Sequence, residues 1–360
     1  MSHTIRIAQT DLHFPCAPGQ TVLDAALAAG IELPHSCRKG VCANCAGRVD
    51  EGLVEGLGGA SLHHEACDLD QVLLCLCVAR SDLLISPTRY RRVDPAAAKT
   101  FVAKVYKHQM VASDVSLLQL RLPAGQRLKF RAGQYLQVIL DDGSRRSYSM
   151  ANPPHESDGV TLHIRHVPGG RFSAVLPTLQ PGDAVRIEGP YGSFGLREDS
   201  QAPLVFVAGG TGFAPIKSIL DDMVKRGDSR RPVTLLWGGR RPEHLYLAAA
   251  VQRWQRLLPG LQFVPAVSEP AADTPPEVFR GDVHQALLER FASLAGHELY
   301  ACGAPALVTA LRQTAVQHLG LAPQDFFSDA FVSGPTPDAE QPRLAAASEA
   351  QTTTAVTQPK

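Results

Sequence analysis

Seven of the eight cysteines in this 360-residue chain lie within its first 77 residues. The eighth, Cys302, stands alone in the rest of the chain. The opening residues show no basic stretch followed by an apolar run, so we expect no signal peptide. Crowded cysteines in a chain of this kind are typical of metal ligands or redox groups rather than of a disulfide framework. We therefore expect a cytoplasmic protein whose N-terminal region holds a metal or a cluster.

Three of the crowded cysteines, Cys37, Cys42 and Cys45, have the spacing C-x4-C-x2-C, and 29 residues separate the third from Cys75. This pattern resembles that of plant-type ferredoxins, in which four thiolates hold a [2Fe–2S] cluster. Gly40 lets the loop turn tightly around such a cluster. A structural zinc site is the alternative, although zinc loops favour C-x2-C pairs on both sides.

The fourth ligand is either Cys75 or Cys77, because both lie in the apolar run VLLCLCV. The ferredoxin-like spacing favours Cys75. The remaining thiols of the region, those of Cys16, Cys67 and Cys77, are then interpreted as small apolar groups in a core.

The pattern along the chain predicts three domains of mixed α+β and α/β class and a tail. Residues 1–90 are expected to form a ferredoxin-like β-grasp unit, and the polar residues 91–98 a linker. Short, evenly spaced strand segments in residues 99–199 favour an antiparallel β-barrel. Strands alternate with helices in residues 200–333, which is typical of a doubly wound parallel sheet. Residues 334–360 carry almost no large apolar side chains, so we expect disorder there.

The barrel segment carries three motifs in order: RSYS at 146–149, GRFS at 170–173 and EGPYGSF at 188–194. They resemble the R-x-Y-S, G-x-x-S and G-P-x-G-x-F motifs of the ferredoxin–NADP⁺ reductase superfamily. The resemblance implies that Arg146 holds the pyrophosphate of FAD, that Tyr148 packs on the flavin ring, and that Ser149 lies near its reactive nitrogen. It also assigns the pyrophosphate contacts of a helix N-terminus to Gly170, Arg171 and Ser173.

The segment GGTGFAP follows a predicted buried strand at 203–208 directly. Glycines allow close approach of the backbone to a phosphate, and the helix that follows attracts its charge. This segment resembles the nucleotide loop of the same superfamily, and YACGAP at 300–305 resembles its Y-x-C-G-x-P motif. The resemblance implies contacts with the nicotinamide nucleotide from Gly209, Gly210, Thr211, Gly212, Pro215 and Gly303.

Two further residues are assigned by this resemblance. Cys302 corresponds to the cysteine that faces the nicotinamide ring, and a buried structural cysteine is its alternative. Phe331, in the segment FSDAF, corresponds to the aromatic residue that covers the flavin, and packing in the core is its alternative.

The choice between NADH and NADPH stays open in the sequence. Arg240 and Arg241 follow a predicted strand and suit the 2′-phosphate of NADPH, whereas Glu269 suits the 2′-hydroxyl of NADH.

Charge and hydropathy exclude some classes of protein. The chain holds 35 Lys and Arg against 35 Asp and Glu, which excludes a polybasic nucleic-acid binder. Its longest apolar run, Val72–Ala79, is too short to cross a bilayer. We therefore expect neither a nucleic-acid partner nor a membrane partner.

The order of the three domains resembles that of the one-piece reductases of bacterial ring-hydroxylating oxygenases. The segments LPHSCRKG, RSYSMANPPHESDG and AGGTGFAPIKSILDD are most similar to the terephthalate dioxygenase branch of that family, and the resemblance covers residues 1–335. It implies an NAD(P)H-dependent oxidoreductase that passes electrons through FAD and a [2Fe–2S] cluster to the Rieske centre of an oxygenase in aromatic hydrocarbon catabolism.

Other acceptors share this layout, namely a di-iron hydroxylase and a dehydratase of the CDP-6-deoxy-glucoseen type. The alternative from a different class is a flavin and iron–sulfur carrier or redox sensor that does not turn over NAD(P)H.

Overall fold

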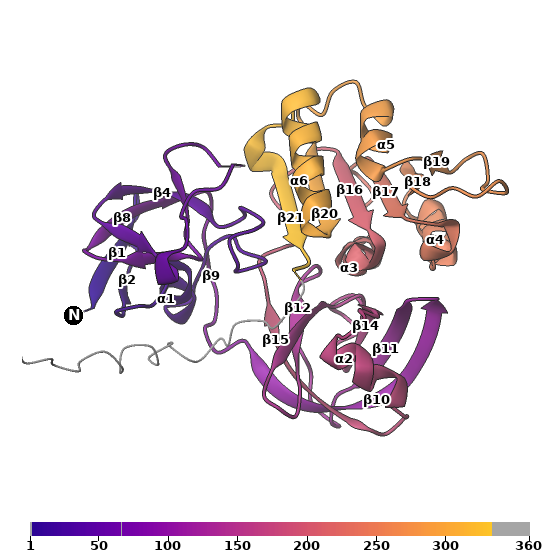
Figure 1. Ribbon diagram of the computed structural model, residues 1–360, viewed down its shortest axis with the longest axis horizontal. Coiled ribbons are helices and arrows are strands. Elements are labelled where there is room, and N and C mark those ends of the chain that lie inside the picture. Colours follow the sequence, from indigo (N-terminus) through magenta and orange to yellow (C-terminus); the bar gives the residue numbers. More distant parts are fainter. Residues whose placement is uncertain (1, 66, 333–360) are drawn as a thin grey trace, which may run out of the picture.

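The computed structural model describes residues 2–65 and 67–332, which form three packed units (Figure 1). The N-terminal unit lies at one side of the view, and the other two lie beside it and one above the other. The tail predicted at 334–360 lies outside the described residues.

The N-terminal unit is a five-stranded sheet in the order β2-β1-β8-β4-β6 with one helix. Its first strand buries Ile5 and Ile7 on one face, as the alternating sequence predicts. Helix α1 (Val22–Ala28) begins where the Thr21 hydroxyl accepts a hydrogen bond from the Asp24 amide. The strands are β1 (His3–Ile7), β2 (His13–Cys16), β4 (Ala46–Glu51), β6 (Gln71–Leu73) and β8 (Leu83–Pro87).

Two short ladders complete this unit. Strand β5 (Val54–Gly56) pairs with β7 (Cys77–Ala79), and β3 (Ile31–Glu32) pairs with β9 (Arg91–Arg92). Strand β9 lies in the segment expected as a linker, so backbone pairing fastens the start of that segment to the N-terminal unit.

The second unit confirms the predicted antiparallel barrel, with six strands in the order β13-β12-β15-β10-β11-β14. Its core is built from alternating positions such as Leu118, Leu120, Leu162 and Ile164. The strands are β10 (Lys99–Ala112), β11 (Val115–Arg121), β12 (Tyr135–Ile139), β13 (Arg145–Ser149), β14 (Gly159–Arg165) and β15 (Ala184–Tyr191). Gly170 caps the short helix α2 (Arg171–Val175), as expected for the second flavin motif.

The third unit confirms the predicted parallel sheet, with the order β19-β18-β17-β16-β20-β21. Phe206 and Ala208 pack on one face, while Val205 and Val207 pack on the other. The strands are β16 (Leu204–Gly209), β17 (Val233–Gly239), β18 (Leu261–Val267), β19 (Phe279–Arg280), β20 (Glu298–Gly303) and β21 (Phe326–Ala330).

Helices cover both faces of this sheet. Helix α3 (Phe213–Arg226) and helix α4 (Ala248–Leu257) supply residues to the first apolar cluster, and α5 (Val283–Arg290) and α6 (Pro305–Gln313) supply residues to the second. Helix α3 ends at Gly227, whose φ of 68° places it in the left-handed region. The strand order reverses beside β16, and ligands of such sheets bind beyond the carboxyl ends of the strands at this point.

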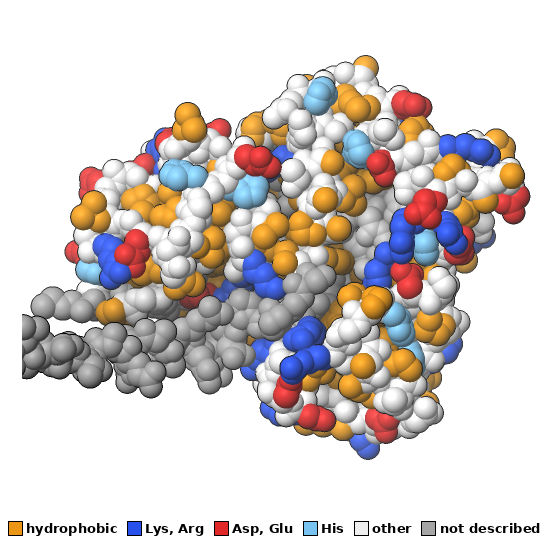
Figure 2. All heavy atoms as spheres, viewed as in Figure 1, with side chains coloured by type: hydrophobic (Ala, Val, Ile, Leu, Met, Phe, Trp, Pro, Cys, Tyr) orange, Lys and Arg blue, Asp and Glu red, His pale blue; other side chains and the backbone are white. Residues whose placement is uncertain are grey.

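The molecular surface mixes charges of both signs. On the face in Figure 2, Lys and Arg side chains are interspersed with Asp and Glu. Within residues 2–65 and 67–332, no helix has the length and apolar character that crossing a membrane requires.

Candidate functional site

A cleft of about 700 Å³ opens where the three units meet. This volume is in the range of ligand pockets in proteins. The N-terminal unit contributes residues 36–39 to its lining, and the barrel contributes parts of β13, β14 and the loop before α2. The parallel-sheet unit contributes residues 209–211, 214, 304, 307 and 329–332. The first two barrel motifs, the nucleotide loop and the first cysteine of the cluster motif therefore share one cleft, whereas the third motif, at 188–194, does not line it.

The first flavin motif forms strand β13, which lines the cleft with residues 146–149. The ring of Tyr148 packs on Phe172 with a centroid distance of 5.6 Å, and burial raises the pKa of the Tyr148 hydroxyl to about 12. Ser149 is buried, and its hydroxyl donates to Asp329 at 3.3 Å. The half-buried Arg146 supplies a cation to the same wall, so this strand offers a flat ring, a hydroxyl and a guanidinium to one ligand.

The second flavin motif closes the same end of the barrel. Gly170, Arg171 and Ser173 all line the cleft. The Ser173 hydroxyl accepts a hydrogen bond from the amide of Val167 at 3.0 Å, which folds the loop over the start of α2. Arg171 also forms an ion pair with Asp142.

The nucleotide loop lies opposite, and a side chain at either of two of its glycines would meet neighbouring atoms. A Cβ atom at Gly210, whose φ is 54°, would lie 2.5 Å from the Arg165 guanidinium. A Cβ atom at Gly212 would lie 2.3 Å from the carbonyl oxygen of Cys302. Gly209, Gly210 and Thr211 line the cleft at the start of α3, so the loop fits a pyrophosphate in this position.

Four of the residues predicted to contact the nucleotide do not line the cleft. Cys302 is fully buried beneath the loop, and burial raises the pKa of its thiol well above the usual value. Gly212, Pro215 and Gly303 also lie outside the lining. Phe331 does line the cleft, and its amide donates to the Gly303 carbonyl at 2.8 Å.

The four predicted cluster ligands come together as two pairs. The thiols of Cys37 and Cys42 are in hydrogen-bond contact, and so are those of Cys45 and Cys75. The loop reaches this shape through left-handed backbone at Arg38, Gly40 and Ala43, with φ values of 54°, 74° and 57°. Hydrogen bonds from Cys42 and from backbone amides lower the pKa of the Cys37 thiol to about 5.

This donor set fits a binuclear cluster better than a single ion. Within the described residues, no three side chains among His, Cys, Asp and Glu are placed to hold one metal ion. Two pairs of thiols give each of two irons two ligands, as a [2Fe–2S] cluster requires. Cys77 is fully buried on β7, where burial raises its pKa to about 12, and it joins neither pair.

The structure adds residues to the cleft that the motifs did not indicate. Asp329 accepts hydrogen bonds from Ser36 and Ser149, and burial raises its pKa to about 6. Tyr135 and Arg165 also line the cleft. The only sequence signal for Asp329 is its place in the segment that contains Phe331.

The two opposing signals for nucleotide choice contact one another. Arg241 Nε lies 3.2 Å from Glu269 Oε2 in an exposed ion pair. Arg240 lies 3.8 Å from Asp114, which belongs to the barrel. Each of the two arginines that could bind a 2′-phosphate is therefore already paired with a carboxylate.

A flavin-type barrel, a doubly wound sheet with a glycine loop and a four-thiol loop at one cleft define an iron–sulfur flavoprotein reductase. Three family models match the chain: "2Fe-2S iron-sulfur cluster binding domain" at residues 5–80, "Oxidoreductase FAD-binding domain" at 102–195 and "Oxidoreductase NAD-binding domain" at 206–313. The chain is an NAD(P)H-dependent oxidoreductase with FAD and [2Fe–2S] as cofactors, and it belongs to the family of the reductase components of terephthalate 1,2-dioxygenase.

The relatives and solved structures agree with this assignment. Reductase component 2 of terephthalate 1,2-dioxygenase from Comamonas sp. is 53% identical over 93% of this chain and 99% of its own. A CDP-6-deoxy-L-threo-D-glycero-4-hexulose-3-dehydrase reductase from Yersinia pseudotuberculosis is 36% identical over 92% and 99% of the two chains. The crystal structure of a cytochrome P450 reductase from Amycolatopsis superposes with a TM-score of 0.73 at 30% identity, covering 91% and 98%.

Proposed function

We propose that this protein is the cytoplasmic reductase of an aromatic-ring dioxygenase and that its acceptor is the Rieske centre of a terminal oxygenase acting on terephthalate or a similar aromatic acid. The observation that carries the proposal is the shared cleft, which both Cys37 and Ser149 line. The 53% identity to a terephthalate 1,2-dioxygenase reductase component over nearly its whole length supports the choice of acceptor.

We assign the FAD to the barrel side of the cleft. Arg146 and the α2 start, with Gly170, Arg171 and Ser173, supply the cation and donors that a pyrophosphate needs. Tyr148 supplies a flat face for the flavin ring, and Ser149 supplies a hydroxyl that donates to the buried Asp329.

We assign the nicotinamide nucleotide to the opposite side. Gly209, Gly210 and Thr211 present backbone donors just before α3, and the two glycines add no side chain there. Phe331 closes the cleft from the end of β21, where it excludes water from the reacting groups. Cys302 supports the loop from below, since its carbonyl packs against Gly212.

We assign the cluster to Cys37, Cys42, Cys45 and Cys75. When bound, the flavin accepts a hydride from the nucleotide and releases electrons singly, and the cluster carries single electrons to the acceptor. The protein's own contribution is to place these groups at one cleft and to exclude water from it.

Reconstitution with purified oxygenase components tests the acceptor. We expect NAD(P)H-driven dihydroxylation of terephthalate when the protein is mixed with a terephthalate dioxygenase oxygenase component. The 36% identity to a dehydrase reductase makes the matching dehydrase the second acceptor to test. Turnover with the dehydrase, and none with the oxygenase, would overturn the proposed acceptor while leaving the reductase class intact.

A further inference from the structure

The cluster loop, residues 33–45 between β3 and β4, is bound to β21, the last strand of the parallel sheet. Asn44 stands between the ligands Cys42 and Cys45. Its side-chain amide donates to the carbonyl oxygen of Ser328 on β21, and its side-chain oxygen accepts from the Ser328 hydroxyl at 2.7 Å. Ser328 is only 2% exposed, so water cannot easily replace these bonds.

The next residue of β21 extends this contact toward the flavin motif. One oxygen of the Asp329 carboxyl accepts from the hydroxyl of Ser36, which precedes the ligand Cys37. Its other oxygen accepts from Ser149, the last residue of the flavin motif. Two consecutive residues of one strand therefore contact the cluster loop, and one of them also contacts the flavin wall.

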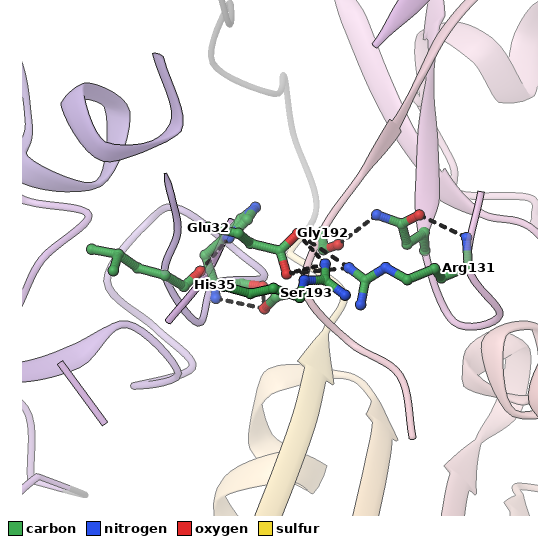
Figure 3. Close-up of polar contacts among 8 residues, drawn as sticks. Glu32, His35, Arg131, Gly192 and Ser193 are labelled. Atoms are coloured by element: carbon green, nitrogen blue, oxygen red, sulfur yellow. Dashed lines mark hydrogen bonds and ion pairs between the residues drawn. The ribbon is translucent and has the colours of Figure 1, made fainter. Parts of the chain in front are cut away.

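The barrel holds the start of the loop (Figure 3). The amide of His35 donates to the Ser193 hydroxyl at 2.8 Å, and that hydroxyl donates to the His35 carbonyl at 2.9 Å. Glu32 accepts from Arg131 of the barrel at 3.1 Å. Polar contacts to two other units therefore fix the loop at both of its ends.

Apolar packing adds to these contacts on the side of β21. The buried ligand Cys42 packs in the same apolar cluster as Val308, Leu311 and Ala330 of the nicotinamide unit. The cluster loop is thus seated on another unit, although the sequence places its ligands more than 250 residues from that unit's last strand.

We propose that Asn44 and Ser328 are positioning residues that hold the cluster loop at the distance from the flavin needed for electron transfer within the chain. The inference rests on the proposed function. Electron transfer between two cofactors slows steeply as their separation grows. Hydride transfer depends on the barrel, the nucleotide loop and Phe331, and the hydrogen bonds between Asn44 and Ser328 involve none of them. Weakening the contact between Asn44 and Ser328 therefore slows electron transfer from the flavin to the cluster and leaves hydride transfer to the flavin unchanged.

The test compares Ser328→Ala and Asn44→Ala with wild type by anaerobic stopped-flow mixing with NADH. Flavin bleaching reports hydride transfer, and the cluster band reports the later step. We expect unchanged flavin reduction and a cluster reduction roughly three- to tenfold slower in each variant. Asn44→Ala removes both hydrogen bonds, whereas Ser328→Ala removes only the bond from its hydroxyl, so the double variant is expected to lose no more than Asn44→Ala alone.

Two controls separate positioning from damage to the cluster. Ser328→Ala lies outside the N-terminal unit, so it tests the idea even if Asn44→Ala assembles its cluster poorly. Dithionite can reduce the cluster directly, without an electron from the flavin, and is expected to do so equally fast in all variants. Ser86→Ala removes an exposed hydroxyl that donates to Asp50 at 2.6 Å, away from the junction, and is expected to behave as wild type.

If the rate of cluster reduction in Ser328→Ala equals the wild-type rate, and wild type does pass electrons from flavin to cluster, the positioning role is overturned. Failure of wild type itself to pass electrons from flavin to cluster would instead overturn the proposed function.

Discussion

The two redox sites of this protein are built in opposite ways. The cluster site has three of its four proposed ligands within the nine residues 37–45, so one short segment of sequence supplies most of its donors. The flavin and nucleotide cleft takes its lining from residues between 36 and 332, in all three units. A short segment of sequence is therefore enough to specify most of the cluster ligands, whereas the position of the cluster relative to the cleft depends on how the three units pack.

The largest expected effect concerns the local site. Cys75→Ser removes a thiol paired with Cys45, so the protein is expected to lose its cluster absorbance almost completely. Cys77→Ser, two residues away on β7, is the matched control and should retain it. Iron content and the visible spectrum of the purified variants provide the measurement. Cluster loss in Cys77→Ser alone would reverse the assignment.

This contrast also explains how much of the molecule the sequence could predict. Thr21 and Gly227 act within one helix end each, so their caps were predictable. The cluster ligands and the flavin-binding residues could be proposed for the same reason, because the residues of each motif lie close together in the sequence.

The positions set by tertiary packing were not predictable. Asp329 meets Ser36 and Ser149 only after three units have assembled, and no pattern in the sequence links these residues. Cys302 is buried beneath the nucleotide loop with its carbonyl packed against Gly212, a contact that the motif alone does not show. That Cys302 faces the nicotinamide stays a prediction. Residues 91–92 were expected as linker, and their pairing with β3 depends on a contact across the N-terminal unit.

The second prediction addresses the assembled site. Arg146→Ala removes the proposed pyrophosphate cation, so the protein is expected to be purified with most of its FAD missing. Arg127→Ala, which removes an exposed partner of Asp158, serves as the control. The flavin-to-protein ratio after gel filtration is the measurement. A full complement of FAD in Arg146→Ala would rule out the proposed contact.

A smaller effect is expected at the exposed pair of Arg241 and Glu269. Glu269→Gln removes the carboxylate that faces Arg241, which frees the guanidinium for a 2′-phosphate. The ratio of kcat/KM for NADPH to that for NADH is expected to rise about two- to fivefold. Glu289→Gln, on α5, is the control. If the NADPH-to-NADH ratio does not change, the ribose that carries the 2′-phosphate does not bind beside Arg241 and Glu269.

The smallest expected effect is on stability and concerns His163, at the wall between the barrel and the nicotinamide unit. Burial lowers the pKa of this imidazole to about 3, so the folded protein binds its proton less readily than the unfolded chain does. Its neutral form therefore favours folding above pH 6.5, and this contribution is lost as the pH falls from about 6.5 toward 3.

His163→Phe removes this dependence and keeps a ring against Phe213. Between pH 7.5 and 5.5 the variant is expected to lose about 1 kcal/mol less stability than wild type. Thermal unfolding at both pH values checks this, with the exposed His318→Gln as control. An equal loss in variant and wild type would show that His163 does not contribute.

An anaerobic titration of the purified protein tests whether one cleft joins hydride transfer to reduction of the cluster. NADH and NADPH are added in parallel while the flavin and iron–sulfur bands are followed. We expect a reduced nucleotide to bleach both bands, with the cluster following the flavin. Flavin and cluster bands that neither nucleotide reduces, or a flavin that is reduced while the cluster stays oxidised, would contradict it.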